Sequence, residues 1–174
     1  MKTLKTILLS LFAFVITQNV CAQTFEVPKN YKFDKKEDYA RYEKEIINCI
    51  NWLEESPLNK EPEKRKEASA FLILWLTGSP NVSIAVDANI VNFTEKNPDL
   101  LMIFMGGWTK FVLENPASAN DAVKGNLAGL KSIIKVYKKG NGIKKDKNVE
   151  KIIKADEKGE LEKWVIDQTK KSKK

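Results

Sequence analysis

The side chains that could do chemistry in this chain are cysteines and carboxylates, because its 174 residues include no histidine. That absence removes the commonest general base, the usual catalytic triads and most zinc sites. Cys49 lies in an apolar helical pattern, so we interpret it as a small buried hydrophobic residue. The glycines match no dinucleotide or P-loop pattern and the acids no EF-hand, so we predict no cofactor and no metal.

Carboxylates are the remaining candidates for catalysis, since a pair of them can hydrolyse a glycosidic bond without histidine. The acids outside obvious helix faces and caps are Glu54, Glu55, Asp87 and Glu114. The sequence does not bring any two of them together, and exposed acids are the norm in folded proteins. We therefore keep a carboxylate-based hydrolase as an alternative hypothesis and assign no catalytic residue.

The glycine pair Gly106-Gly107 is the most unusual local feature, because it interrupts an apolar helical pattern. Each glycine costs a helix roughly 1 kcal/mol relative to alanine, which indicates that the fold needs bare backbone there. Close packing of two helices is the favoured interpretation. The alternative is a ligand site formed by Gly106, Gly107, Trp108 and Lys110.

Positive charge is concentrated in the last quarter of the chain. Residues 131–174 hold 15 lysines and 7 acids, whereas residues 23–130 hold 13 lysines and arginines and 16 acids. Arginine, the residue suited to bidentate reading of bases and phosphates, occurs only at Arg41 and Arg65, so no nucleic-acid partner is predicted. We expect an anionic envelope component or an unknown protein as partner, the alternative being a solvated lysine-rich face.

Residues 1–22 have the pattern of a secretory signal peptide. Lys2 and Lys5 precede an apolar run from Ile7 to Ile16, and small residues end the segment at Ala22. These ten residues are too few to cross about 30 Å of hydrocarbon, so we expect cleavage and no transmembrane segment afterwards.

Cleavage after Ala22 would give a periplasmic or secreted bacterial protein whose first residue is Gln23. A glutamine after the cut, in a lysine-rich and arginine-poor chain, resembles exported proteins of Gram-negative bacteria. Lipidation of Cys21 is the rival event, but Gln18-Asn19-Val20 fits a lipoprotein site poorly. Since Cys21 leaves with the signal, Cys49 has no partner for a disulfide within the chain.

Apolar residues at steps of three and four predict most of the helices. The expected helices cover residues 35–54, 99–113, 123–137, 149–155 and 160–169. Asp34 with Glu37 predicts a cap on the first, Gly140 an end to the third, and Asp146 a cap on the fourth. Phe71–Leu76 is apolar on all sides and predicts a central buried helix. Residues 81–93 fit both a helix and a strand, and we favour a helix because nothing could pair with a lone strand.

Four prolines, Pro62, Pro80, Pro98 and Pro116, are spaced 18 residues apart, and the last three follow Ser or Asn. A capping residue followed by proline is a common helix start, so the spacing predicts one helix per interval. In helix length and period, Pro62 to about Ile134 resembles tetratricopeptide-type helical repeats. The tryptophan, glycine and tyrosine signature of that family is absent, so the resemblance implies no binding residues.

Together these patterns predict an all-α fold of six or seven helices packed as consecutive antiparallel hairpins, either repeat-like or a compact bundle. The expected organisation is a signal peptide (1–22), an irregular lead-in (23–33), one helical domain (34–169) and a basic tail (170–174). The expected function is that of an exported, non-enzymatic interaction module for a protein or envelope component. The alternatives are a carrier of a small apolar ligand or lipid, and the hydrolase. The oligomeric state does not follow from these patterns.

Overall fold

A computed structural model describes residues 24–171, so the predicted signal peptide and the last three residues lie outside the described part. Within it the chain forms seven α-helices and one short 3-10 helix with no strand, which confirms the all-α prediction. The α-helices are α1 (Lys36–Arg41), α2 (Glu43–Glu55), α3 (Pro62–Gly78), α4 (Asp99–Glu114), α5 (Ala122–Lys139), α6 (Lys147–Glu157) and α7 (Leu161–Lys171). The 3-10 helix η1 is Pro116–Ser118.

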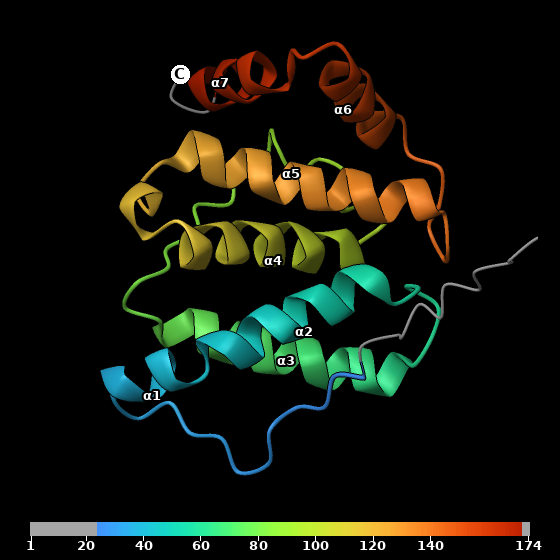
Figure 1. Cartoon of the computed structure of the whole chain (residues 1–174). Helices are drawn as coiled ribbons and strands as arrows, with labels where there is room; N and C mark the ends of the chain where they lie inside the picture. The colour runs from blue at the N-terminus through green and yellow to red at the C-terminus, as the bar shows by residue number, and fades with distance from the viewer. Residues whose placement is uncertain (1–23, 172–174) are drawn as a thin grey trace, which may run out of the picture.

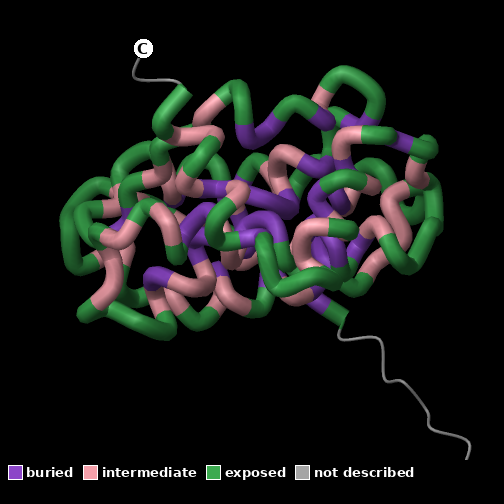
Figure 2. Tube along the Cα trace, turned by 90° about the horizontal axis from the view of Figure 1, so that it is seen from above, coloured by how far each residue is buried: buried purple, intermediate pink, exposed green. Residues whose placement is uncertain are grey.

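The helices are stacked in three layers (Figure 1). One layer holds α1, α2 and α3, the middle one holds α4 with α5 stacked on it, and α6 and α7 cover the far side of α5. The pairs α2/α3 and α4/α5 each run antiparallel. Seen from above, buried residues gather along the middle of the molecule and exposed residues surround them (Figure 2). One hydrophobic cluster extends from Phe25 to Val165.

The central helix is α4, not the segment Phe71–Leu76 in α3. Eight of the sixteen residues of α4 are buried, because α2 covers one side of it and α5 the other. In α3, Phe71, Leu72 and Trp75 are buried, but Ile73 is 46% exposed and Leu74 51% exposed. The prediction for Phe71–Leu76 was therefore wrong, since α3 lies in an outer layer and has one covered face.

The helix predicted over residues 35–54 is divided in two at Tyr42. Its backbone leaves the helical region there (φ −99°, ψ 5°), and its ring lies edge-on to Phe33 and Phe71, with centroid distances of 5.4 and 6.2 Å. The start is capped by Asp38, whose carboxylate accepts the N–H groups of Asp34 and Lys35 at 3.1 and 3.0 Å. The predicted cap by Asp34 was wrong, because the acid inside the first turn reaches back to these N–H groups.

The irregular lead-in is anchored to the first layer by aromatic contacts. Phe25 is 7% exposed, and its ring centroid lies 6.4 Å from those of both Trp52 and Phe71. The segment before α1 therefore contributes to the core although it forms no helix or strand.

Residues 81–93 are neither helix nor strand. They begin a segment that passes behind α4 and α5 in Figure 1 and buries Val82, Ile90, Val91 and Phe93. Asp87 accepts the Asn89 N–H on its side chain at 2.8 Å and the Ile90 and Val91 N–H groups on its carbonyl. The favoured helix was wrong, because local side-chain bonds of this kind compete with helical hydrogen bonds.

The 18-residue proline spacing does not correspond to one helix per interval. Pro62 is the first residue of α3, as predicted, but Pro80 follows the end of α3 and Pro116 begins only η1. Pro98 directly precedes α4, yet the Asn97 side chain does not cap this helix; it bonds the Lys144 backbone at 2.9 and 2.8 Å. The cap of α5 is Asp121, which accepts the Lys124 N–H.

The predicted signals of the C-terminal part are confirmed. Gly140 ends α5 with a left-handed φ of 72°, and the Asp146 carboxylate caps α6 by accepting the Asn148 N–H at 2.7 Å. Helix α7 continues to Lys171, so Lys170 and Lys171 belong to a helix and not to the expected tail.

Candidate functional site

Gly106 and Gly107 lie where α4 is pressed against α2 and α5. A Cβ atom on Gly106 would stand 3.2 Å from Cγ2 of Ile50, and one on Gly107 would stand 2.9 Å from the Ala128 carbonyl oxygen. Gly129 on α5 is the counterpart, since its Cβ would stand 2.7 Å from the Phe104 carbonyl oxygen. At Gly107 and Gly129 bare backbone allows α4 and α5 to approach closely, whereas Gly106 faces the Ile50 side chain of α2.

Trp108 and Lys110 have different environments although both belong to α4. Trp108 is 2% exposed, and its ring occupies the space in which a Cβ of Gly125 would stand. Lys110 reaches the surface, where Nζ donates to Asn51 Oδ1 at 2.8 Å and lies 4.0 Å from Glu114 Oε1. The four candidate residues therefore do not form one continuous exposed site.

A hollow of about 310 Å³ between α2, α4 and α5 brings together two candidate acids, Glu54 and Glu114, with Gly107 and Lys110. We call it the α4–α5 hollow. Its remaining lining residues are Phe111, Ala128, Lys131, Ser132 and Lys135. Asp87 lies outside this group.

The acids at one end of the α4–α5 hollow are held in ion pairs. The Glu54 carboxylate, 5% exposed, accepts Ser132 Oγ at 2.7 Å and Lys135 Nζ at 2.9 Å. Lys135 also reaches Glu55 at 2.7 Å, and Lys139 bonds the same Glu55 carboxylate. Both acids are thus bound to lysines of α5, and Glu54 also to Ser132.

The pKa directions of these groups do not favour acid–base catalysis at this place. Hydrogen bonds from Lys135 and Lys139 lower the pKa of Glu55, whereas a general acid needs a raised one. Partial burial disfavours charge on Lys135, but its bonds to Glu55 and Glu54 outweigh this and raise its pKa, so the amine is no base near neutral pH.

Cys49 is fully buried and its thiol donates to the Ala68 carbonyl at 3.3 Å. Burial raises its pKa to about 12, so thiolate is scarce at neutral pH. This supports the interpretation of Cys49 as a core residue.

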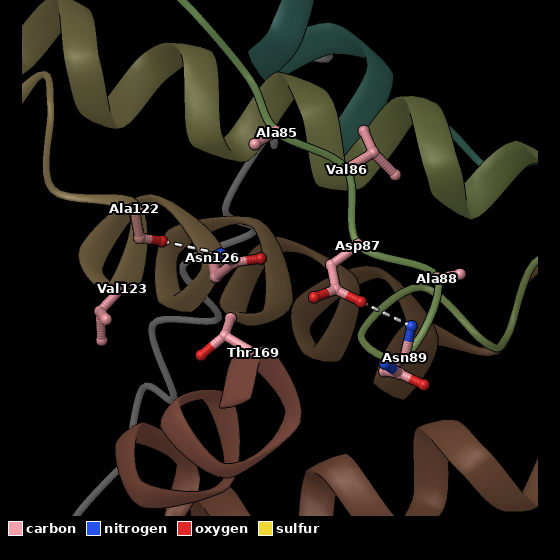
Figure 3. Close-up of a pocket in the computed structure, with 9 residues that line it drawn as sticks. All are labelled: Ala85, Val86, Asp87, Ala88, Asn89, Ala122, Val123, Asn126 and Thr169. Carbon is pink, nitrogen blue, oxygen red and sulfur yellow. Dashed lines mark hydrogen bonds between the residues drawn. The ribbon is translucent and has the colours of Figure 1, made fainter. Parts of the chain in front are cut away.

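A pocket of about 640 Å³ lies between residues 85–89, the first turns of α5 and the end of α7 (Figure 3). We call it the α5–α7 pocket. Its walls are small and apolar: Ala85, Val86, Ala88, Ala122 and Val123. Its polar lining residues are Asp87, Asn89, Asn126 and Thr169.

Asn126 is the most constrained polar group of the α5–α7 pocket. It is 2% exposed, and its Nδ2 donates to the Ala122 carbonyl at 2.7 Å. Its Oδ1 is buried with no hydrogen-bond partner among the described residues. In Figure 3 this oxygen points away from Ala122, toward the side of the pocket on which Asp87 lies.

The exposed face of α6 and the residue that ends the helix carry four lysines at steps of four, three and four: Lys147, Lys151, Lys154 and, at the C-cap, Lys158. We call them the α6 lysine row. Steps of this size place the four side chains along one stripe of the helix. Within residues 24–171 none of the four lies within ion-pair distance of an acid.

The acids of α6 form ion pairs with lysines outside the α6 lysine row. Asp156 pairs with Lys131 at 2.5 Å and Glu157 with Lys138 at 3.0 Å, both across to α5, while Glu150 lies 3.6 Å from Lys145. The positive charge of α5 is thus largely neutralised by acids of α2 and α6. Among residues 24–171, the lysines of this end that form no ion pair are the α6 lysine row and Lys144, Lys163, Lys170 and Lys171. The row is the largest group of these lysines at helical spacing.

No known family model, curated protein or solved structure matches the chain. No three His, Cys, Asp or Glu side chains of residues 24–171 are grouped so as to hold a metal ion. Across the same residues, no helix combines the length and apolar character needed to cross a membrane.

Sequence reasoning missed both the pocket and the α6 lysine row, although signals for each were present. The lysine steps of four, three and four can be read directly from residues 147–158. Asn126 stands four residues before Leu130 and seven before Ile133, so it falls on the apolar face of its helix. A polar residue on such a face is a signal for a buried polar site.

Proposed function

We propose that this protein is an exported, non-enzymatic interaction module that binds an acidic polysaccharide of the cell envelope through the α6 lysine row. The observation that carries the proposal is the division of charge on α6. Its acids pair with lysines of other segments, while the four lysines of the row are exposed and have no acid partner among residues 24–171. A line of like charges attracts a polymer of opposite charge.

The surroundings of the row favour a polymer over a lipid surface. Among the described residues, the large apolar side chains with high exposure are Ile73, Leu74 and Val86, and none of them belongs to α6. A helix that enters a membrane interface places large apolar side chains beside its lysines. The row therefore suits an electrostatic contact with a soluble chain of negative charges.

Binding to dextran sulfate, with neutral dextran as reference, tests the proposed binding through the α6 lysine row. We would replace Lys147, Lys151, Lys154 and Lys158 by glutamine. Four contacts of about 0.4 kcal/mol each, within the range of exposed ion pairs, amount to a loss of about tenfold in affinity. The interaction should also weaken with added salt, because exposed charges are screened.

The matched control replaces four exposed lysines of the first layer, Lys32, Lys36, Lys44 and Lys66, by glutamine, with the same change in net charge. It should bind dextran sulfate as the wild type does. Equal losses in both variants would mean that net charge alone attracts the polymer. Full retention by the α6 variant would overturn the assignment of the row.

Export is tested by expressing the whole chain in a Gram-negative bacterium and weighing the protein recovered from the periplasm. The expected mass is that of residues 23–174. A chain that begins at an added Met before Gln23 is the control and should remain in the cytoplasm. An uncut cytoplasmic product would contradict the proposed export, and a lipid on Cys21 would contradict cleavage after Ala22.

A further inference from the structure

We infer that the α5–α7 pocket binds a neutral apolar molecule that carries one hydrogen-bond donor, such as an apolar alcohol. This site is independent of the α6 lysine row, because the two share no residue. Three features of the pocket carry the inference: the unpaired oxygen of Asn126, the way in which the neighbouring donors are used, and the apolar walls.

The side-chain oxygen of Asn126 is a buried acceptor without a partner. Asn126 is 2% exposed, and its Oδ1 has no hydrogen-bond partner among the described residues. Nδ2 of the same amide donates to the Ala122 carbonyl at 2.7 Å, which holds the amide so that Oδ1 points away from Ala122 (Figure 3). Because an unpaired buried acceptor is unfavourable, a ligand that donates a hydrogen bond to Oδ1 gains free energy on binding.

The donors of Asn126 and Thr169 are directed into the protein. The Thr169 hydroxyl has a single hydrogen, and its oxygen lies 3.1 and 2.9 Å from the carbonyl oxygens of Val165 and Ile166. Nδ2 of Asn126 is directed to Ala122 in the same way. A ligand that brought only an acceptor would therefore meet oxygen lone pairs on these two side chains. The polar group of the ligand is expected to be a donor.

The ligand is also expected to be neutral. Asp87 and Asn89 line the pocket, but they are bonded within the chain, where the Asp87 carboxylate accepts the Asn89 N–H at 2.8 Å, so we assign them no part in binding. None of the nine lining residues is lysine or arginine. A charged group that moved from water into this pocket would find no free counter-ion, which is unfavourable.

The walls define the body of the ligand. Alanine and valine side chains surround a space of about 640 Å³, which is within the range of small-molecule sites, about 300–1,000 Å³. These side chains offer no hydrogen bond to a second polar group. The ligand is thus expected to have a compact apolar body and one polar end.

Menthol and menthone test the inference, because they share a carbon skeleton and differ in one group. The hydroxyl of menthol can donate, whereas the carbonyl of menthone can only accept. Each is titrated into the purified protein and followed by the NMR shifts of the Asn126 side-chain amide and the Thr169 backbone amide. Menthol should bind about tenfold more tightly than menthone, because only menthol can donate to the Asn126 oxygen. Menthylammonium, which has the same skeleton and a positive charge, should bind more weakly than menthol.

Variants locate the binding. Ala122→Trp fills the pocket from the exposed first residue of α5 and should abolish menthol binding, whereas Asn126→Leu should remove the preference for menthol over menthone. The matched controls are Ala70→Trp, at an exposed position of α3, and Asn48→Leu, at an exposed position of α2. Both should bind menthol as the wild type does.

Four outcomes would overturn the inference. They are equal affinity for menthol and menthone, tighter binding of menthylammonium than of menthol, unchanged menthol binding by Ala122→Trp, and a crystal structure in which a buried water satisfies Asn126 while no probe binds. The first two use the wild-type protein, so they remain measurable even if a variant fails to fold.

Discussion

Helix α5 meets its neighbours in two chemically different ways. Against α4 the contact is made by glycines and aromatic rings, with Gly107 over Ser132 and Gly129 under Phe104. Against α2 and α6 the contact includes lysines that reach glutamates and aspartates at its margins. Close packing is intolerant of added volume, whereas exposed ion pairs contribute little to stability. We therefore expect substitutions on the side of α5 that packs against α4 to change stability more than substitutions of its exposed ion pairs.

The largest effect is expected at the close-packed side. Gly129→Ala places a Cβ atom 2.7 Å from the Phe104 carbonyl oxygen, which cannot rotate away. Overpacking costs about 1–3 kcal/mol, and a backbone contact that cannot yield puts the cost near the upper end, about 3 kcal/mol. Alanine returns about 1 kcal/mol of helix propensity, so we expect a net loss of about 2 kcal/mol. Urea unfolding followed by circular dichroism measures it.

The control for Gly129 is Gly106→Ala, whose Cβ would have the Ile50 side chain as its nearest neighbour, with Cγ2 at 3.2 Å. Since a side-chain methyl can shift, the change in unfolding free energy should stay within about 1 kcal/mol. Equal destabilisation by the two variants would contradict the idea that backbone contact makes the α4–α5 interface intolerant.

The next effect concerns the one buried acid of the charged side. Glu54→Gln removes the charge that Lys135 and Ser132 bond, while it keeps the size of the side chain. Because Lys135 is 46% exposed, solvent replaces part of the lost bond, and we expect a loss of about 1–2 kcal/mol in unfolding free energy. The comparison is Glu55→Gln, whose side chain is 55% exposed. An equally small loss of unfolding free energy in both variants would show that the burial of Glu54 does not strengthen its ion pair.

A smaller effect should appear in the pH dependence of stability. Bonds from Lys135 and Lys139 lower the pKa of Glu55 in the folded state below its usual 4.5. A lowered folded-state pKa stabilises the protein above the usual value, and this contribution disappears as the pH falls through the lowered pKa. The stability difference between wild type and Glu55→Gln should therefore be largest near pH 7 and shrink in acid. A constant difference in urea unfolding from pH 7 to pH 3 would refute this.

The smallest effect is expected for the exposed pair of Lys138 and Glu157, whose side chains are 52% and 58% exposed. A double-mutant cycle with glutamine at both positions should give a coupling energy below about 0.5 kcal/mol. A coupling above about 1 kcal/mol would mean that the α5–α6 boundary is held by its charges as firmly as the α4–α5 interface is held by packing.

Much of the fold could be predicted because its helices are marked by local signals. Asp146, Gly140 and Pro62 act within a few residues of the helix ends that they define. The failures share another cause. Tyr42 breaks a helix for contacts with Phe33 and Phe71, and Asn97 bonds Lys144 instead of the helix that follows it. Partners this distant along the chain leave no local pattern.

The candidate sites also combine local signals, which the sequence shows, with distant contacts, which it does not show. The lysine steps of α6 are local, but their lack of partners depends on where α5 places Lys131 and Lys138. Asn126 falls on an apolar helix face by periodicity alone. The pocket beside it depends on the irregular residues 85–89 and on the last turns of α7, which bring Thr169 next to α5.

By itself the sequence determined the all-helical class, most helix ends, the buried thiol of Cys49 and the need for bare backbone at Gly107. These properties depend on spacing within one helix turn or on residue type, which a sequence displays directly. Only the tertiary structure decided that α4 is the central helix, which lysines are neutralised, and that a pocket with an unmet acceptor lies between α5 and α7. Those properties depend on contacts between residues far apart in the chain, and packing selects such contacts through the sum of many small energies.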